Sequence, residues 1–232
     1  MQVKLISKTV GVGDFSGRSI DELILGQARI SSNRKDLFGQ PERLLRHFVN
    51  NQHWSVFTMA DLGFQIITSR AMSHELIRHW SLDFQEFSQR YSPVVYCEPI
   101  ELREKSESRQ SSSVPFTKTL QYNPNEVAGM LLEIYHEFLT NDVAPETARF
   151  ILPETTQTKL NVKGDLRSWI TFLNARLHKT AQKEIRLIAE EIKDAFIAEC
   201  PIIAKCFYNF EDAYEVPFLD RIILEKYKDE QL

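Results

Sequence analysis

The segment Arg78–Tyr91, with the sequence RHWSLDFQEFSQRY, contains a concentration of side chains that could bind an anion. Its closely spaced candidates for one phosphate are Arg78, Glu86, Ser88 and Arg90. An arginine can donate two parallel hydrogen bonds to a phosphate, and a serine hydroxyl with nearby backbone N–H groups can satisfy the remaining oxygens. The same composition is also typical of a polar surface hairpin with ordinary salt bridges, and the segment alone leaves both interpretations open.

Other polar groups along the chain have a functional and a structural interpretation. Arg29 and Ser31 follow an expected helix, where they could bind a ligand or form a salt bridge and a helix C-cap. His53 lies among aromatic residues, where a satisfied core histidine is the commoner case. Arg149 interrupts an apolar stripe, so it either pairs with Glu146 or faces an anion.

The segment Asp165–Arg176 has the spacing of an amphipathic helix capped by its first residue. Its inward face is expected to carry Trp169, Phe172 and Leu173. A neighbouring polar stripe carries Arg167, Thr171 and Asn174. The helix therefore could present polar groups beside a buried core.

An α+β fold is expected to position these residues, with a mixed or antiparallel sheet flanked by helices, because strands and helices intermingle without regular βαβ alternation. The expected strands are Val3–Ile6, Leu62–Thr68 and Thr155–Val162, with Phe84–Tyr91 and Val94–Cys97 also extended. The expected helices are Ser19–Ile30, one starting at Pro41, Arg70–His79, Asn125–Leu139, Pro145–Ile151, Asp165–His178 and Thr180–Cys200.

We expect a single domain over residues 1–232, with residues 105–121 as a mobile loop. The loop contains the polar run ESRQSSS, which has few residues able to build a core. It is the best place for a domain boundary, yet the flanking segments show no sign of independent cores.

Composition and missing motifs exclude several classes of protein. A net charge of −4 gives no general attraction to nucleic acid or anionic membranes. No apolar run has the length of a membrane span or of a signal peptide. The three cysteines lack metal-type spacing, which favours reduced thiols. We therefore expect a cytoplasmic protein. Dinucleotide, P-loop, GxSxG and metal-ligand motifs are absent, and no cysteine lies in an arginine-rich segment. If the protein is an enzyme, a bound organic cofactor is expected to perform its chemistry.

Taken together, the polar groups resemble the flavin-dependent thymidylate synthases. The signature of that family is Arg-His-Arg, seven residues, then Ser, with a closing Arg-Tyr; this chain has Arg78-His79-Trp80, seven residues, Ser88, and Arg90-Tyr91. The resemblance extends, in the same order, over roughly residues 1 to 200. Its other elements are Ala28–Ser31, His53–Ser55, Arg149 with Leu152-Pro153, Arg167-Ser168 and Asn174–Arg176.

The resemblance implies a homotetramer that binds FAD between subunits and methylates dUMP at C5. Methylenetetrahydrofolate would be the carbon donor and NADPH the reductant, with reduced flavin relaying both the one-carbon unit and the hydride. No enzyme cysteine would attack the pyrimidine, and no metal would be involved. Nucleic acids and membranes are not expected partners.

The resemblance also implies roles for individual residues. Nucleotide binding would fall to Glu75, Arg78, Glu86, Phe87, Ser88, Gln89, Arg90, Arg149 and Arg176. Flavin binding would fall to Ser31, His53, Ser55, Arg78, His79, Trp80, Glu86, Asp165, Arg167 and Thr171. The candidate catalytic residues are Arg176, whose cation would favour an N3-ionised pyrimidine, and Ser88, which we assign to binding because no base is placed to activate it.

The chain departs from the family at positions near the expected nucleotide. Trp80 stands in place of an arginine, Glu75 in place of a glutamine, and Asp83 in place of a small neutral residue. On the flavin side, Asp165 replaces an asparagine and Thr58 a glutamate. Three interpretations stay open: methylation of dUMP; methylation or hydroxymethylation of another pyrimidine nucleotide such as dCMP or UMP; or a catalytically weakened nucleotide-binding homologue.

Overall fold

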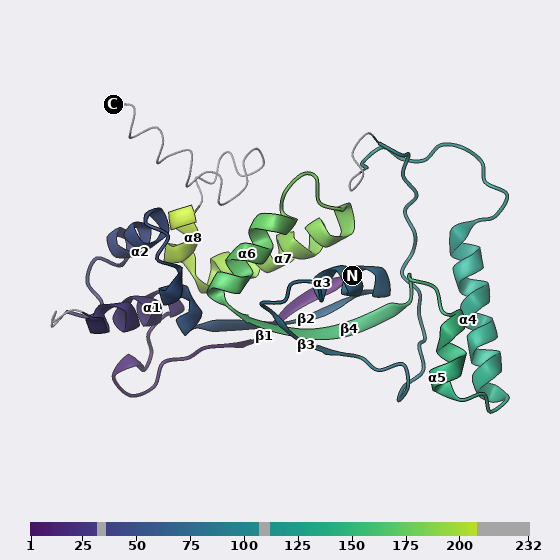
Figure 1. The fold of residues 1–232 in the computed structure, drawn as a ribbon, viewed down its shortest axis with the longest axis horizontal. Coiled ribbons are helices and arrows are strands. Elements are labelled where there is room, and N and C mark those ends of the chain that lie inside the picture. The colour runs from purple at the N-terminus through teal and green to yellow at the C-terminus, as the bar shows by residue number, and fades with distance from the viewer. Residues whose placement is uncertain (32–35, 107–111, 208–232) are drawn as a thin grey trace.

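A four-stranded antiparallel sheet forms the centre of the computed structural model, which describes residues 1–31, 36–106 and 112–207 (Figure 1). Its strands are β1 (Gln2–Lys8), β2 (Asp61–Ser69), β3 (Asp83–Glu86) and β4 (Gln157–Asp165), in the order β1-β2-β4-β3. The central pair is continuous, from Asp61 opposite Asp165 to Ser69 opposite Gln157. The sheet thus joins segments that lie far apart in the sequence.

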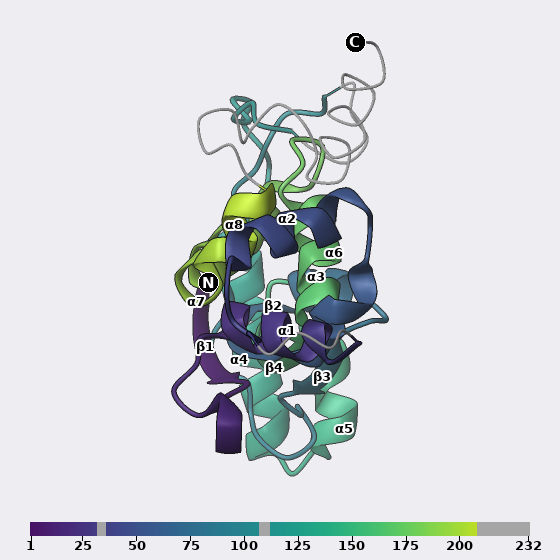
Figure 2. The same ribbon diagram turned by 90° about the vertical axis from the view of Figure 1, so that its left-hand side faces the viewer.

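Helices cover one face of the sheet and one of its ends. α3 (Arg70–Leu76), α6 (Leu166–Arg176) and α7 (Lys183–Glu199) lie over the face. α1 (Ile20–Ala28), α2 (Pro41–Asn50) and α8 (Pro201–Phe207) gather at one end (Figures 1 and 2). The main hydrophobic cluster lies between these helices and the sheet. It includes Leu62, Phe64, Ile66, Leu160, Val162, Trp169, Phe172, Leu173, Ile188 and Ile192.

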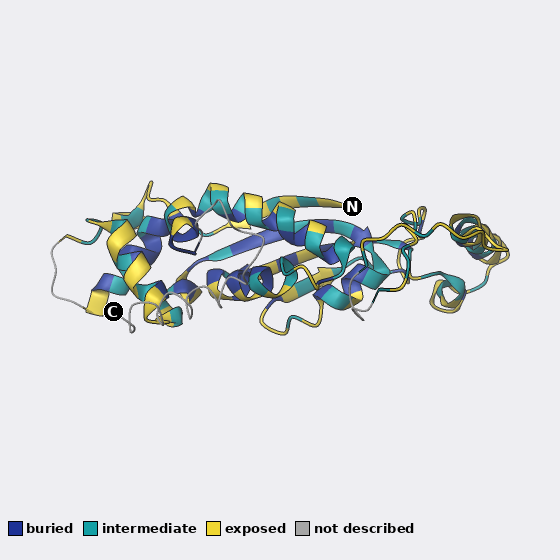
Figure 3. Cartoon of the chain, turned by 90° about the horizontal axis from the view of Figure 1, so that it is seen from above, coloured by how far each residue is buried: buried dark blue, intermediate teal, exposed yellow. Residues whose placement is uncertain are grey.

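A second, smaller hydrophobic cluster lies at the other end of the elongated molecule. There α4 (Pro124–Thr140) and α5 (Pro145–Ala148) pack together, and many residues of α4 are exposed (Figures 1 and 3). The cluster is built on Val94, Tyr135 and Ala148, and Phe87 and Ile151 pack against it. It therefore joins the segment that follows β3 to the segment that contains Arg149.

Most of the expected elements are present, which confirms the α+β class and an antiparallel sheet. The three expected strands occur with shifted ends, and each of the seven expected helices has a counterpart in the structure. Ser19 caps α1 in a capping box with Glu22, and the Asp165 carboxylate caps α6 by accepting from Ser168 N at 2.7 Å. Trp169, Phe172 and Leu173 are buried as expected.

Of the two segments expected to be extended, Phe84–Tyr91 is a strand only at its start, and Val94–Cys97 pairs with the chain through a single bridge. In Phe84–Tyr91 the named strand ends at Glu86, and Phe87 N still donates to Lys159 O of β4 at 2.8 Å. The segment then turns, and Tyr91 N donates to Ser88 O at 3.1 Å. In Val94–Cys97, Cys97 forms an isolated bridge with Thr156 and no named strand includes the segment.

Two helix ends also differ from expectation. α3 ends at Leu76, so Arg78 and His79 follow the helix rather than complete it. α8 was not expected, because its first N–H groups are capped by a residue remote in sequence: Asp21 accepts from Ile202 N at 3.1 Å and from Ile203 N at 2.9 Å. A local sequence pattern does not reveal such a cap.

The two arms of the expected loop at 105–121 are paired near its base. Glu104 N donates to Val114 O at 2.8 Å, and Phe116 N donates to Leu102 O at 3.1 Å. Residues 107–111 of this loop lie outside the described residues, as do residues 208–232 of the expected domain. The mobility of the loop and the single domain stay predictions.

Candidate active site

The antiparallel pairing of β2 and β4 determines where the candidate site forms. α3 follows β2 at one end of the strand pair, and α6 follows β4 at the opposite end. α6 has 11 residues, so its two ends lie about 15 Å apart. Because α6 runs back over the sheet, its last residue, Arg176, meets Glu75 and His79 at the end of α3.

A cavity of about 770 Å³ opens where α3 and α6 meet. Four residues assigned to ligands by the sequence lie in its wall: Glu75, Arg78, His79 and Arg176. The rest of the wall consists of Ala71, His74, Ala181 and Gln182. Pockets that hold small organic ligands typically have volumes of about 300–1,000 Å³, so the cavity is large enough for one.

Arg176 is bonded on two sides within this cavity. Its Nη1 donates to Glu75 Oε1, and its Nε donates to His79 Nε2 at 2.8 Å. Because Nε2 accepts, the proton of a neutral His79 ring lies on Nδ1. Burial, and next the charge of Arg176, lower the pKa of His79 to about 4, so its imidazole is neutral at neutral pH.

Arg78 supplies a positive charge that is available to a ligand. Its exposed side chain lines the cavity, and it forms no ion pair with any residue that the structure describes. An arginine in this state can bind an anion without first breaking an internal salt bridge.

Glu86 is held by three donors on one carboxylate oxygen. Arg70 Nη1 lies 2.6 Å from Oε1, Ser73 Oγ donates at 2.7 Å, and Thr158 Oγ1 donates at 2.8 Å. Ser73 and Thr158 are buried, so this contact is shielded from water. Three donors fix the orientation of the carboxylate and leave Oε2 without a partner among the described residues.

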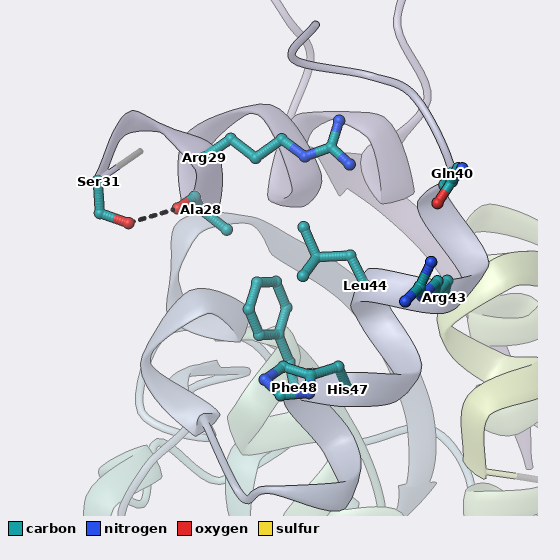
Figure 4. Close-up of a pocket in the computed structure, with 8 residues that line it drawn as sticks. All are labelled: Ala28, Arg29, Ser31, Gln40, Arg43, Leu44, His47 and Phe48. Carbon is teal, nitrogen blue, oxygen red and sulfur yellow. Dashed lines mark hydrogen bonds between the residues drawn. The ribbon is translucent and has the colours of Figure 1, made fainter. Parts of the chain in front are cut away.

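A second cavity, of about 420 Å³, lies between α1 and α2 and contains Ser31 (Figure 4). Arg29 there donates to Gly39 O and, at 2.9 Å, to Asp36 O, so it fixes the segment before α2. Ser31 Oγ donates to Ala28 O at 3.1 Å, as a residue at the end of a helix does. The remaining wall residues are Gln40, Arg43, Leu44, His47 and Phe48.

His53 is an exposed residue beside this second cavity and not the buried core histidine of the alternative interpretation. Its ring centre lies 5.6 Å from that of His47, which lines the cavity. Ser31 and His53, both assigned to flavin by the resemblance, are thus neighbours of one cavity.

The segment after β3 and the segment of Arg149 form a separate group. The Arg90 guanidinium lies 5.7 Å from the ring centre of Tyr91, and that of Arg149 lies 5.9 Å from the ring centre of Phe150. Neither arginine has an ion pair among the described residues, so of the two alternatives for Arg149 the pair with Glu146 is not formed. Gln89 is buried, and Ser88 Oγ accepts from Arg90 N at 3.4 Å.

Of the flavin residues expected on α6, Asp165 and Arg167 lie at the end of that helix far from Arg176, and Thr171 lies in its middle. Asp165 is its N-cap, and Thr171 Oγ1 donates to Arg167 O at 3.0 Å. Both Arg167 and Thr171 are exposed. Ser55, which the resemblance also assigns to flavin, is exposed, and its carbonyl accepts from Thr58 Oγ1 at 2.8 Å.

Two of the departures from the family pattern lie in different surroundings. Trp80 is 93% exposed just after the cavity residue His79. Asp83 lies on β3 three residues before Glu86, and successive side chains of a strand point to opposite faces. Asp83 lines a cavity of about 230 Å³ together with Lys163 and Gln85, while Glu86 faces α3. Asp83 is therefore on the other face of the sheet from Glu86.

The residues that hold Glu86 were not predicted from the sequence. Arg70 and Ser73 are three positions apart on α3, a spacing that puts both on one helix face, and this signal could have identified them. Thr158 could not be identified in this way, because its contact depends on the pairing of β4 with β3.

No group of His, Cys, Asp and Glu side chains in the described part of the chain could hold a metal ion. Within the same residues, no helix is long and apolar enough to cross a membrane. Cys200 and Cys206 are buried, and burial raises the pKa of both thiols, that of Cys206 to about 11. This agrees with the expectation that neither is a nucleophile.

Sequence comparison relates this chain to known enzymes. A family model described as "Thymidylate synthase complementing protein" matches residues 15–202. A flavin-dependent thymidylate synthase of Synechocystis sp. is 36% identical over 213 residues, which cover 88% of this chain and 98% of that protein. A probable flavin-dependent thymidylate synthase of Paramecium bursaria Chlorella virus 1 is 33% identical over 212 residues, with the same coverage of 88% and 98%.

Structure comparison gives the same fold. The UMP/dUMP methylase PolB from Streptomyces cacaoi has been solved with 5-Br dUMP and with 5-Br UMP. The two structures match this chain with TM-scores of 0.73 and 0.74 at 22% identity, and they cover 89% of this chain. The matched part is 94% of the first PolB chain and 92% of the second. At this identity the match shows a shared fold.

Proposed function

The chain belongs to the flavin-dependent thymidylate synthase family, and from this premise we propose that it methylates dUMP at C5 to give dTMP. It is an enzyme with FAD as cofactor. In the proposed reaction, the methylene carbon of methylenetetrahydrofolate bonds to C5 and the C5 proton leaves. A hydride that originates from NADPH reduces this carbon to a methyl group, and tetrahydrofolate and NADP⁺ are released.

The residues of the Arg176 cavity fit a flavin ring. The ring has several acceptor atoms and two broad apolar faces, and the cavity combines the donors Arg78 and His79 Nδ1–H with the small apolar Ala71 and Ala181. When bound, reduced FAD would supply the hydride for the one-carbon unit. We propose that its other contacts come from the remaining residues of the family pattern: Ser31, His53, Ser55, Trp80, Glu86, Asp165, Arg167 and Thr171.

For the nucleotide, we propose that the arginines without internal ion pairs bind the phosphate. These are Arg78, Arg90 and Arg149, with backbone N–H groups of Ser88 and Gln89 as further donors. Phe87 and Glu86 would contact the nucleotide from the same segment. We assign Ser88 to binding, because its hydroxyl has no contact with a base among the described residues.

Arg176 and Glu75 would contact the pyrimidine. Because Glu75 and His79 hold the Arg176 guanidinium from two sides, its donors need not reorient when charge develops on the ring. A preorganised donor of this kind typically contributes about 3–4 kcal/mol to transition-state stabilisation. His79, neutral because of its lowered pKa, would add a donor without adding charge.

The separation of the groups within one chain supports an assembly of several copies, and we propose the homotetramer. The segments of Arg90 and Arg149, the Arg176 cavity with Arg78, and the Ser31 cavity lie in three parts of an elongated molecule: at the second cluster, beside α3, and between α1 and α2. A neighbouring copy could bring one group to another.

The single observation that carries the proposal is that Arg78, His79 and Arg176 meet in one cavity. The purified protein is expected to bind FAD with flavin absorbance. It should release tritium from 5-labelled dUMP only when methylenetetrahydrofolate and NADPH are both added. Parallel assays with labelled UMP and dCMP test the other bases, and product analysis distinguishes a methyl from a hydroxymethyl group.

A matched pair of variants gives this experiment its control. Arg176→Ala is expected to lower the rate by about 100-fold or more. Arg46→Ala removes an exposed arginine that pairs with Glu42 on α2, and it should leave the rate unchanged. Absence of tritium release from all three nucleotides by the FAD-loaded protein would refute the proposed reaction.

A further inference from the structure

Glu75 and Arg176 form an ion pair, and both residues line the cavity. Each side chain is 22% exposed. Glu75 Oε1 accepts from Arg176 Nη1, and Arg176 Nε is used by His79. Within the described part of the chain, Glu75 Oε2 and Arg176 Nη2 have no hydrogen-bond partner. The pair therefore offers a ligand one acceptor beside one charged donor.

An acceptor next to a donor in the wall of a cavity binds only a ligand whose edge presents a donor next to an acceptor. A carboxylate only accepts, and a guanidinium only donates. The matching edge has an N–H next to an acceptor atom. Uracil offers this edge as N3–H beside a carbonyl oxygen, and cytosine offers it as the exocyclic N–H beside N3.

We propose that Glu75 is a specificity-determining residue that requires an N–H on the Watson–Crick edge of the pyrimidine. The inference rests on the proposed function, because it concerns the base in the same cavity. It changes the role expected of Arg176 from the sequence. A lone cation would favour an N3-ionised ring, whereas an ionised N3 has no N–H and carries a negative charge toward the carboxylate. The paired site instead binds the neutral ring.

Methylation of the N–H nitrogen is the direct test. The dissociation constants of dUMP, 3-methyl-dUMP, dCMP and N4,N4-dimethyl-dCMP would be measured by calorimetry on the FAD-loaded protein. The nucleotide that binds is expected to lose about 10- to 100-fold in affinity when its N–H is replaced, since an unpaired buried acceptor costs about 1–3 kcal/mol. Loss with 3-methyl-dUMP identifies uracil as the base, and loss with the dimethyl compound identifies cytosine.

Glu75→Ala separates hydrogen bonding from steric exclusion. Removal of the carboxylate is expected to reduce the methylation penalty to less than about threefold, because the acceptor is gone and the small side chain leaves room for the methyl group. Glu42→Ala is the control, since it breaks another Arg–Glu pair outside the cavity and should retain the full penalty. Bound flavin absorbance confirms that each variant is folded.

The outcomes distinguish this inference from the proposed function. If dUMP or dCMP binds and methylation of its N–H has no effect, the inference is wrong while nucleotide binding stands. The same holds if Glu75→Ala keeps the full penalty. If no pyrimidine nucleotide binds to the FAD-loaded protein, the proposed function fails as well.

Discussion

Two buried threonines near the start of β4 offer a test of how Glu86 is held. Thr158 is 3% exposed and donates to Glu86 Oε1 at 2.8 Å. Thr156 is 0% exposed, and its hydroxyl has no hydrogen-bond partner in the part of the chain that the structure describes. Replacement by valine keeps the shape of either side chain and removes only the hydroxyl. The two substitutions should therefore differ in their effect on stability.

The magnitudes follow from the contacts. A hydrogen bond to a charged acceptor contributes about 1.5–3 kcal/mol. Since Arg70 and Ser73 stay on the same oxygen, we expect Thr158→Val to lower the free energy of unfolding by about 1–2 kcal/mol. Thr156→Val is expected to leave it unchanged or to raise it by up to about 1 kcal/mol, because it removes a buried hydroxyl without a partner.

Urea unfolding of both variants, followed by circular dichroism at one protein concentration, measures the difference. In thermal unfolding, Thr158→Val should lower the melting temperature by about 2–8 °C for a chain of this size. Equal concentrations are needed because association of copies shifts the apparent stability. Equal effects of the two substitutions would refute the view that Glu86 depends on the Thr158 hydroxyl.

Three other predictions concern residues of the site and the thiols. Burial and Arg176 lower the pKa of His79 to about 4, so the unfolded chain protonates this imidazole at a higher pH than the folded chain does. The free energy of unfolding should therefore decrease as pH falls from about 6.5 to 4. In urea unfolding, His79→Gln should weaken this pH dependence. Iodoacetamide at neutral pH should leave Cys200 and Cys206 unmodified by mass spectrometry, since burial raises the pKa of both. Trp80 is 93% exposed, so Trp80→Ala should change the free energy of unfolding by less than about 0.5 kcal/mol yet weaken FAD or folate binding in a fluorescence titration.

Local patterns in the sequence were sufficient to predict much of the fold. The apolar spacing of Asp165–Arg176 predicted both the helix and its inward residues, because helix periodicity and an N-cap act within a few residues. The same holds for the alternating strand that became β2. Local patterns failed where a distant partner decides the structure. Asp21 caps α8 from the other end of the chain, and Phe87, where β3 ends, packs against a cluster that contains the remote Tyr135.

The candidate site was predictable only as a set of residues. The motif identified Glu75, Arg78, His79 and Arg176 without indicating that they share one cavity, since that depends on the antiparallel order of β2 and β4. Asp83 shows the reverse case. Its place in the motif indicated a carboxylate near the phosphate, but strand alternation directs it to the opposite face of the sheet from Glu86.

The arginines of the site look alike in the sequence and differ in what they bond. Arg70 is paired with Glu86, and Arg176 is bonded to Glu75 and His79. Arg78, Arg90 and Arg149 have no ion pair among the described residues. An arginine that is already in an ion pair orients its partner. An arginine without an ion pair can bind a phosphate without breaking an internal salt bridge. In the proposed site, the division of roles between base and phosphate would thus follow from which carboxylates the fold brings to each guanidinium.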